Sequence, residues 1–234
     1  MNSKVYILHG WAIDENNQVK WQNFRQELEK YDIESVFLKI PGLDNKLEKP
    51  WQFSDYINWL EQELKGEKNL ILLGHSFGGQ LSLAFACQNP QKINKLILID
   101  SAGIRDASWK NRIKRQIFAS IAKIGKPFFG KTIAQKIFHK ITGATDYSQA
   151  DEIMKKTMQN VITKNIETEL PKIKAETLLI WGQNDKITPV SLAKRFQKGI
   201  KNAQIQLIKE ARHAPQFTHF KEIAKLIAEF LNQK

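Results

Sequence analysis

A serine at the centre of a Gly-x-Ser-x-Gly pattern is the residue in this chain best suited to do chemistry. The pattern is Gly74-His75-Ser76-Phe77-Gly78. The apolar run at 69–73 before it predicts a buried strand, and residues 80–88 after it predict a buried helix. A serine at such a strand–turn–helix junction is held in a strained backbone conformation with its hydroxyl above the sheet. We therefore predict that Ser76 is a nucleophile.

A serine nucleophile needs a histidine that accepts its proton. His213 is the favoured base, because it lies in the loop 209–215 after a predicted strand at 204–208, and sites collect at the carboxyl ends of parallel strands. His219, within a predicted terminal helix, is the alternative. The remaining histidines are His9, His75 and His139.

An acid that orients the histidine is expected in the loop after the preceding strand. Asp185 is the candidate, because it lies in the loop 182–189 that follows a predicted strand at 177–181. An aspartate here could instead only cap the turn and the next helix. Asp100, which ends the predicted strand at 95–99, is a rival acid.

Two backbone N–H groups are needed to stabilise the oxyanion that forms during acyl transfer. One is expected from Phe77, the residue after the nucleophile. The other is expected from Trp11, in the segment His9-Gly10-Trp11-Ala12 that follows a predicted first strand at 5–8. Gly10 allows the backbone to turn close to the substrate.

These motifs occur in an order that resembles the α/β-hydrolase superfamily. The resemblance is to its capped group, which includes esterases, carbon–carbon bond hydrolases and acyl-carrier-protein methyl ester esterases. It implies a triad of Ser76, Asp185 and His213 and no cofactor, and a serine nucleophile disfavours the dehalogenase and epoxide hydrolase branches. The matching segments are HGWA at 9–12, PGL at 41–43, GHSFGG at 74–79, LILIDSAG at 96–103, WGQNDKITP at 181–189 and ARHAP at 211–215.

Strand and helix signals alternate along the chain, which predicts an α/β fold with a mostly parallel sheet of about six strands and helices on both faces. The core is expected at residues 1–103 and 166–234. Strands are expected near 4–9, 33–39, 69–74, 95–100, 176–181 and 204–208, and helices near 19–30, 52–65, 77–88, 189–199 and 216–232.

Residues 104–165 carry no strand signal and predict a helical cap inserted after the strand that ends at Asp100. Trp109, Ile113 and Ile117 begin an apolar stripe at helical spacing, which would line the substrate tunnel or pack on the core. Substrate contacts are predicted for His9, Gly10, His75, Trp109, Ile113 and Ile117.

The predicted cap is strongly basic, with thirteen Lys/Arg and four Asp/Glu, and it holds most of the net charge of +12. Such a charge excess can be a solvated helix face. It also suits an anionic substrate, an acidic protein that presents an acyl substrate, or an anionic membrane surface. Nucleic acid is not expected, because no nucleic-acid motif accompanies the charge.

The remaining composition predicts one packed domain in a 234-residue chain. No apolar run is long enough to cross a bilayer, and no signal peptide is expected. The single cysteine, Cys87, is expected to be a core residue, and the histidines are too scattered for a metal site. We expect a cytoplasmic monomer.

The function predicted from the sequence is hydrolysis of an acyl or aryl ester by a serine carboxylesterase mechanism. Carbon–carbon bond or acyl-thioester and acyl-carrier-protein ester cleavage is the alternative, because the same triad serves all of them. An interfacial lipase and a non-enzymatic ligand-binding protein of the same fold are further alternatives.

Overall fold

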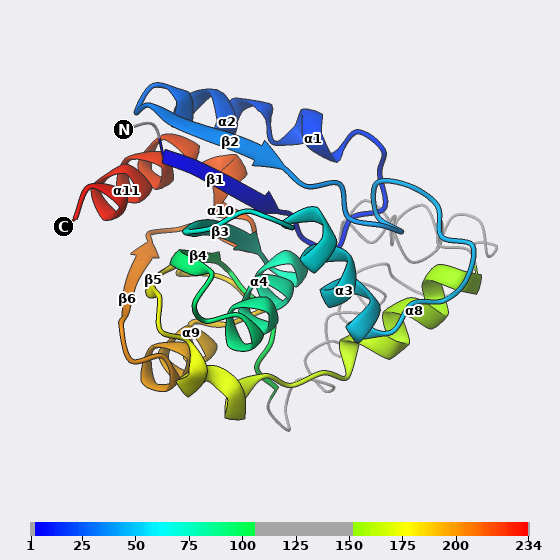
Figure 1. Cartoon of the computed structure of the whole chain (residues 1–234). Coiled ribbons are helices and arrows are strands. Elements are labelled where there is room, and N and C mark those ends of the chain that lie inside the picture. The colour runs from blue at the N-terminus through cyan, green and yellow to red at the C-terminus, as the bar shows by residue number, and fades with distance from the viewer. Residues whose placement is uncertain (1–2, 106–151, 234) are drawn as a thin grey trace, which may run out of the picture.

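A parallel six-stranded sheet forms the centre of the computed structural model, which describes residues 3–105 and 152–233. The order of the strands is β2-β1-β3-β4-β5-β6, and every neighbouring pair is parallel, as predicted (Figure 1). The strands are β1 (Ser3–Leu8), β2 (Ile33–Phe37), β3 (Leu70–His75), β4 (Ile93–Ile99), β5 (Glu176–Gly182) and β6 (Ala203–Ile208).

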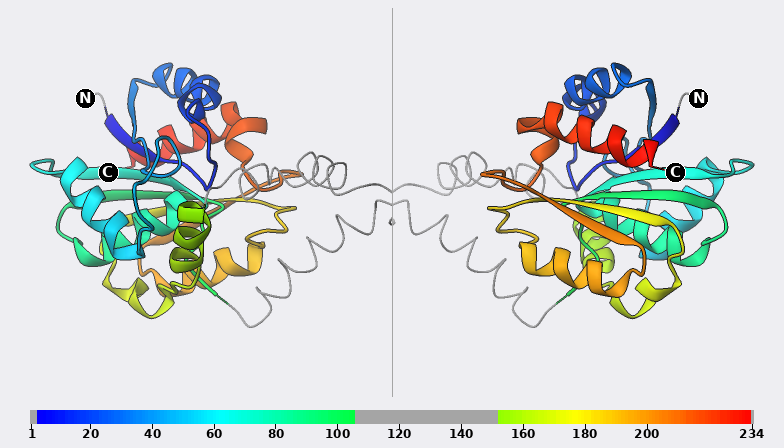
Figure 2. Two further views of the ribbon diagram at one scale, coloured as in Figure 1. Left: turned by 90° about the vertical axis from the view of Figure 1, so that its right-hand side faces the viewer. Right: turned by 90° about the vertical axis from the view of Figure 1, so that its left-hand side faces the viewer.

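Helices cover both faces of the sheet (Figures 1 and 2). Side chains alternate between the two faces along each strand, so Val5 and Ile7 join one apolar core while Tyr6 and Leu8 join the other. None of the described helices is both long and apolar enough to cross a membrane. One face is covered by α1 (Asn17–Lys20), α2 (Gln22–Glu29), α10 (Pro215–Thr218) and α11 (Phe220–Asn232), and the other by α3 (Phe53–Glu63), α4 (Phe77–Gln88) and α9 (Val190–Gly199).

Two of the expected helices are interrupted. The helix expected at 19–30 is divided at Trp21 into α1 and α2, and the helix expected at 216–232 is divided at His219 into α10 and α11. The placement of His219 inside one continuous helix was therefore wrong, because its ψ of 33° is not helical. A 3-10 helix, η1 (Glu167–Lys172), was not predicted. It contains Pro171, whose missing N–H disfavours a longer α-helix.

Helix α8 (Glu152–Ile162) lies within the predicted cap segment, of which residues 104–105 and 152–165 are described. It is joined to the core through Thr157, whose Oγ1 accepts a hydrogen bond of 3.0 Å from the Trp51 amide, and through Asn160, whose Nδ2 donates to the Trp51 carbonyl at 3.0 Å. The expected stripe residues Trp109, Ile113 and Ile117 lie outside the described residues.

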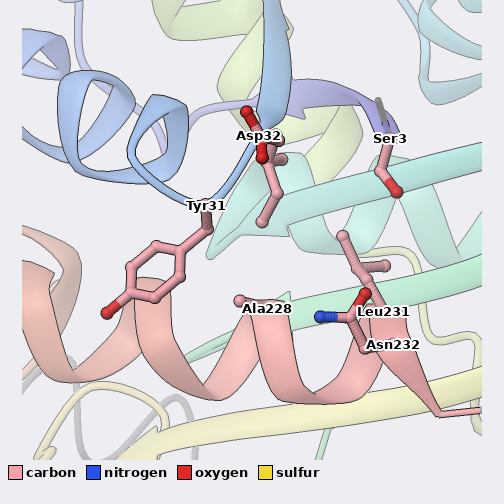
Figure 3. A pocket seen from close by; sticks show the side chains of 7 residues that line it. Ser3, Tyr31, Asp32, Ala228, Leu231 and Asn232 are labelled. Carbon is pink, nitrogen blue, oxygen red and sulfur yellow. The ribbon is translucent and has the colours of Figure 1, made fainter. Parts of the chain in front are cut away.

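A polar hollow of about 230 Å³ lies near the amino ends of β1 and β2, beside the last turns of α11. Its lining includes Ser3, Tyr31, Asp32 and Asn232 (Figure 3). The motifs singled out in the sequence follow the carboxyl ends of the strands instead. This hollow therefore lies at the opposite edge of the sheet from them.

Candidate active site

The turn between β3 and α4 holds Ser76 in a conformation that is unusual for a residue with a side chain. Its φ is 50° and its ψ is −114°. The turn is tight because a Cβ on Gly78 would lie 2.1 Å from the carbonyl oxygen of Leu8. The Ser76 amide donates to the carbonyl of Ile99 at 3.1 Å, which ties the turn to β4. Strain of this kind persists only where the surroundings enforce it, and it is common at functional sites.

The two residues whose amides were predicted to bind an oxyanion line one cavity together with this serine. Phe77 is the first residue of α4, so its N–H has no partner within the helix and lies at the positive end of the helix dipole. Trp11 packs edge-on against the Phe77 ring, with 5.1 Å between the ring centroids. No described residue accepts a hydrogen bond from either amide.

The loop that carries Trp11 is fixed by a buried network around His9. The Nε2 of His9 lies 2.7 Å from Oδ2 of Asp44, and its Nδ1 lies 2.8 Å from the carbonyl oxygen of Gly10. The His9 ring also stacks on Phe37, with 5.3 Å between centroids. His9 is only 1% exposed, so its contacts in the structure are with the protein interior.

Asp44 was not singled out in the sequence. Besides contacting His9, its Oδ2 accepts a hydrogen bond of 2.6 Å from the Ile40 amide, and its Oδ1 accepts one of 3.2 Å from Asn17. Asn17 also donates to the Ala12 carbonyl at 2.8 Å. Asp44 directly follows the Pro-Gly-Leu segment. Its place beside this turn was the sequence feature that could have marked it as a site residue.

Asp185 and His213 are joined in the loops that follow β5 and β6. The Nδ1 of His213 lies 2.8 Å from Oδ2 of Asp185. Asp185 is 5% exposed, and its Oδ1 accepts hydrogen bonds from the amides of Ile187 at 2.7 Å and Thr188 at 3.1 Å. Since a carboxylate accepts, the Nδ1 of His213 carries the proton and Nε2 is left as the acceptor.

The surroundings of His213 change its affinity for a proton. Burial opposes the charged imidazolium, but the hydrogen bond and negative charge of Asp185, together with the charge of Asp100, raise the pKa of His213 above its ordinary value. His75, adjacent to Ser76, lies against His213 with 5.0 Å between ring centroids. Burial holds the pKa of His75 well below its ordinary value, so this neighbour is neutral.

The rival residues have other partners. His219 contacts Thr218, with 2.8 Å between its Nδ1 and the Thr218 hydroxyl. Asp100 is completely buried and accepts hydrogen bonds from the amides of Gly182 at 2.8 Å and Ala214 at 3.0 Å. The structure therefore pairs His213 with Asp185. The described hydrogen bonds do not include one between Ser76 and His213, a contact that often tightens only when substrate binds.

A cavity of about 170 Å³ opens beside Ser76. Trp11, Phe77 and Thr188 line it together with Ser76, and Arg105 is a charged residue in its wall. Its remaining lining is largely apolar and includes Ile104, Ile187 and the α8 residues Met158, Val161 and Ile162. The α8 residues were missed, although their three- and four-residue spacing could have indicated them.

Three residues predicted to contact substrate are not part of the described lining of this cavity. They are His9, Gly10 and His75. A Cβ on Gly10 would lie 2.7 Å from Nδ1 of His75, so Gly10 allows its loop to pack directly against the serine turn.

Comparisons with known proteins match most of this chain. The model of the family described as Serine aminopeptidase, S33 matches residues 52–217. A Biotin biosynthesis bifunctional protein BioHC from Teredinibacter turnerae is 26% identical over 99% of the chain, which spans only 45% of that longer protein. A Pimeloyl-[acyl-carrier protein] methyl ester esterase from Nitrosomonas europaea is 24% identical, over 93% of this chain and 91% of the relative.

The fold is also found among solved structures. An α/β hydrolase from a Medee basin deep-sea metagenome library superimposes with a TM-score of 0.77 at 19% sequence identity. The match covers 100% of this chain and 90% of the other.

Proposed function

Because this chain belongs to the α/β-hydrolase superfamily, in the family described as Serine aminopeptidase, S33, we propose that it is a serine hydrolase that cleaves carboxylic esters through an acyl-enzyme intermediate. The observation that carries the proposal is the 2.8 Å contact between Nδ1 of His213 and Asp185. This contact leaves Nε2 of His213 free to accept a proton. The His213 ring also packs against His75, the residue next to Ser76.

In the proposed reaction, Oγ of Ser76 attacks the ester carbonyl carbon while Nε2 of His213 takes the hydroxyl proton. The carbonyl oxygen becomes negatively charged and receives hydrogen bonds from the amides of Trp11 and Phe77. Collapse of this intermediate expels the alcohol, which takes the proton from His213. Water then attacks the acyl carbon while His213 takes one of its protons. The bond between the acyl carbon and Oγ breaks, His213 returns the proton to Oγ, and the acid leaves.

The two amides are proposed to supply a large share of the rate enhancement. Each is held in place before the substrate arrives: Phe77 by α4, and Trp11 by the loop that Asp44 and His9 fix. Donors that are fixed in advance need no reorganisation when charge develops, and loss of one typically costs about 3–4 kcal/mol of transition-state stabilisation.

The apolar cavity supports an acyl substrate. Met158 and Ile162 of α8 and Ile104 form a surface that removes an aliphatic or aryl chain from water. Arg105 is half-buried in the same wall, and burial lowers its pKa from the ordinary value. The Nε of Arg105 donates to the Lys164 carbonyl at 3.2 Å, and a guanidinium in the cavity wall can also form a charge-assisted hydrogen bond with an anionic group on the substrate. We therefore propose an acyl ester whose chain lies along α8 and carries a carboxylate near Arg105.

A panel of p-nitrophenyl esters tests this function. We expect turnover to depend on acyl-chain length and to be lost in Ser76→Ala. The rate measured with Ser76→Ala is subtracted as the background hydrolysis caused by surface lysines. Esters with a terminal carboxylate should have a lower KM than neutral esters of equal length, and Arg105→Gln should abolish that difference. Saturable binding of these esters with no turnover above that of Ser76→Ala would instead indicate a binding protein.

A further inference from the structure

A second buried carboxyl group lies beside the proposed triad and has no part in the reaction described above. Asp100 follows β4 and is completely buried, with a φ of 43° that a non-glycine residue rarely adopts. Its Oδ1 accepts a hydrogen bond of 2.8 Å from the amide of Gly182, and its Oδ2 accepts one of 3.0 Å from the amide of Ala214. Gly182 ends the strand before Asp185, and Ala214 directly follows His213.

Asp100 therefore joins the two loops that carry the proposed acid and base. Its main chain extends this connection, because the Thr188 hydroxyl lies 3.1 Å from the Asp100 carbonyl oxygen and 2.6 Å from Oδ2 of Asp185. The same stretch of chain also holds the serine turn, since the Ala102 amide donates to the Ser76 carbonyl at 3.0 Å. The segment after β4 thus contacts the elements that carry all three proposed triad residues.

The side chains of Asp100, Asp185 and His213 could together suggest a metal site, because one ligand atom from each lies within 4.8 Å of the others. Each oxygen of the two carboxylates, however, already accepts at least one hydrogen bond from a protein N–H or O–H group. The Nδ1 of His213 is also occupied by Asp185. We therefore interpret the cluster as a hydrogen-bonded network.

The surroundings of Asp100 act on its charge in opposite directions. Burial raises the pKa of Asp100 to about 7, and the negative charge of Asp185 acts in the same direction. His213 and the two amide hydrogen bonds oppose these effects. In turn, the charge of Asp100 favours the protonated form of His213. Asp185 and His213 are the titratable groups that act on Asp100, and the neutral His75 also faces His213.

We propose that Asp100 is a positioning residue that fixes the loop of His213 against the loop of Asp185 and places a second negative charge beside the imidazole. The inference rests on the proposed function for its catalytic meaning. Its structural content can be tested separately, because the titration of His213 can be measured whether or not the protein hydrolyses an ester.

The test compares wild type with Asp100→Asn by NMR titration of ¹³C-labelled histidine, with His213→Gln used to assign the resonance. The asparagine keeps the shape but replaces one acceptor oxygen with an NH₂ group, so one of the two amides loses its partner. We expect the midpoint of His213 to fall by roughly half a pH unit or more. Thr177→Val is the control, because Thr177 is buried at the amino end of β5 and its hydroxyl donates to the nearby Ala175 carbonyl, away from the proposed triad.

An unchanged His213 midpoint in folded Asp100→Asn would overturn the proposal. If this variant does not fold, the unmodified protein still decides the question. The amide protons of Gly182 and Ala214 should then shift together with pH, with one shared midpoint. Amides that do not move, or that follow different midpoints, would contradict the proposal.

Fluorophosphonate labelling of Ser76 separates the two ideas. We expect Asp100→Asn to slow labelling of the wild-type serine about tenfold at the pH where His213 is neutral, while Thr177→Val does not. A wild type that is never labelled would refute the proposed function, whereas the NMR titration would still decide the role of Asp100.

Discussion

Replacing the proposed nucleophile by glycine should stabilise the fold while it abolishes hydrolysis. Ser76 has a φ of 50° and a ψ of −114°, a region that glycine enters readily and other residues rarely do. Backbone strain of this kind costs about 1–3 kcal/mol. Glycine gives back about 0.4–1 kcal/mol through the greater freedom of the unfolded chain. We therefore expect Ser76→Gly to be more stable than wild type by roughly 1 kcal/mol, the difference between these two terms.

Ser76→Ala is the matched control, because it removes the hydroxyl but keeps the Cβ that causes the strain. In thermal unfolding, Ser76→Gly should melt about 2–4 °C above Ser76→Ala, given the usual conversion for a chain of this length. Both variants should be equally inactive. A glycine variant that melts at or below the temperature of the alanine variant would refute the claim that the turn is strained at this residue.

Other changes should give equally specific results. Gly78→Ala should cost more than about 3 kcal/mol in urea unfolding, because its Cβ would lie 2.1 Å from the backbone oxygen of Leu8; a cost below about 1 kcal/mol would contradict the tight turn. The pH profile of kcat/KM should rise with a midpoint above about 6.5, because His213 must be neutral and its pKa is raised; a lower midpoint would oppose its role as base. Asp100 has a folded pKa of about 7, above its unfolded value, so wild type should lose stability as pH rises between these values. Asp100→Asn has no carboxyl group to titrate at this position. The free energy of unfolding of wild type minus that of Asp100→Asn should therefore fall by roughly 2 kcal/mol between pH 5 and pH 7; a constant difference would indicate an ordinary pKa.

The sheet could be predicted from the sequence because each strand has a recognisable local pattern of residues. Residues 69–73 and 177–181 are apolar runs of strand length, and strands buried on both faces have that composition. The positions of Ser76, Asp185 and His213 follow from the same reasoning, since each lies just after a predicted strand and parallel strands bring such residues to one edge.

The contacts that hold the site in place could not be predicted, because they depend on tertiary structure. Asp44 lies 35 positions from His9, and nothing in the sequence between them indicates that they meet. Asp100 was weighed as a rival acid, yet its amide partners at Gly182 and Ala214 are visible only in the folded chain. The break at His219 was missed because the apolar periodicity continues across it.

The central claim is that Ser76 is an activated nucleophile whose base is His213. The most direct measurement is intact-protein and peptide mass spectrometry after reaction with a fluorophosphonate, on wild type, Ser76→Ala and His213→Ala. The account predicts a single adduct on Ser76 in the wild type, no adduct in Ser76→Ala and almost none in His213→Ala. An adduct on another residue, equal labelling of His213→Ala, or an unlabelled wild type that is folded would contradict it.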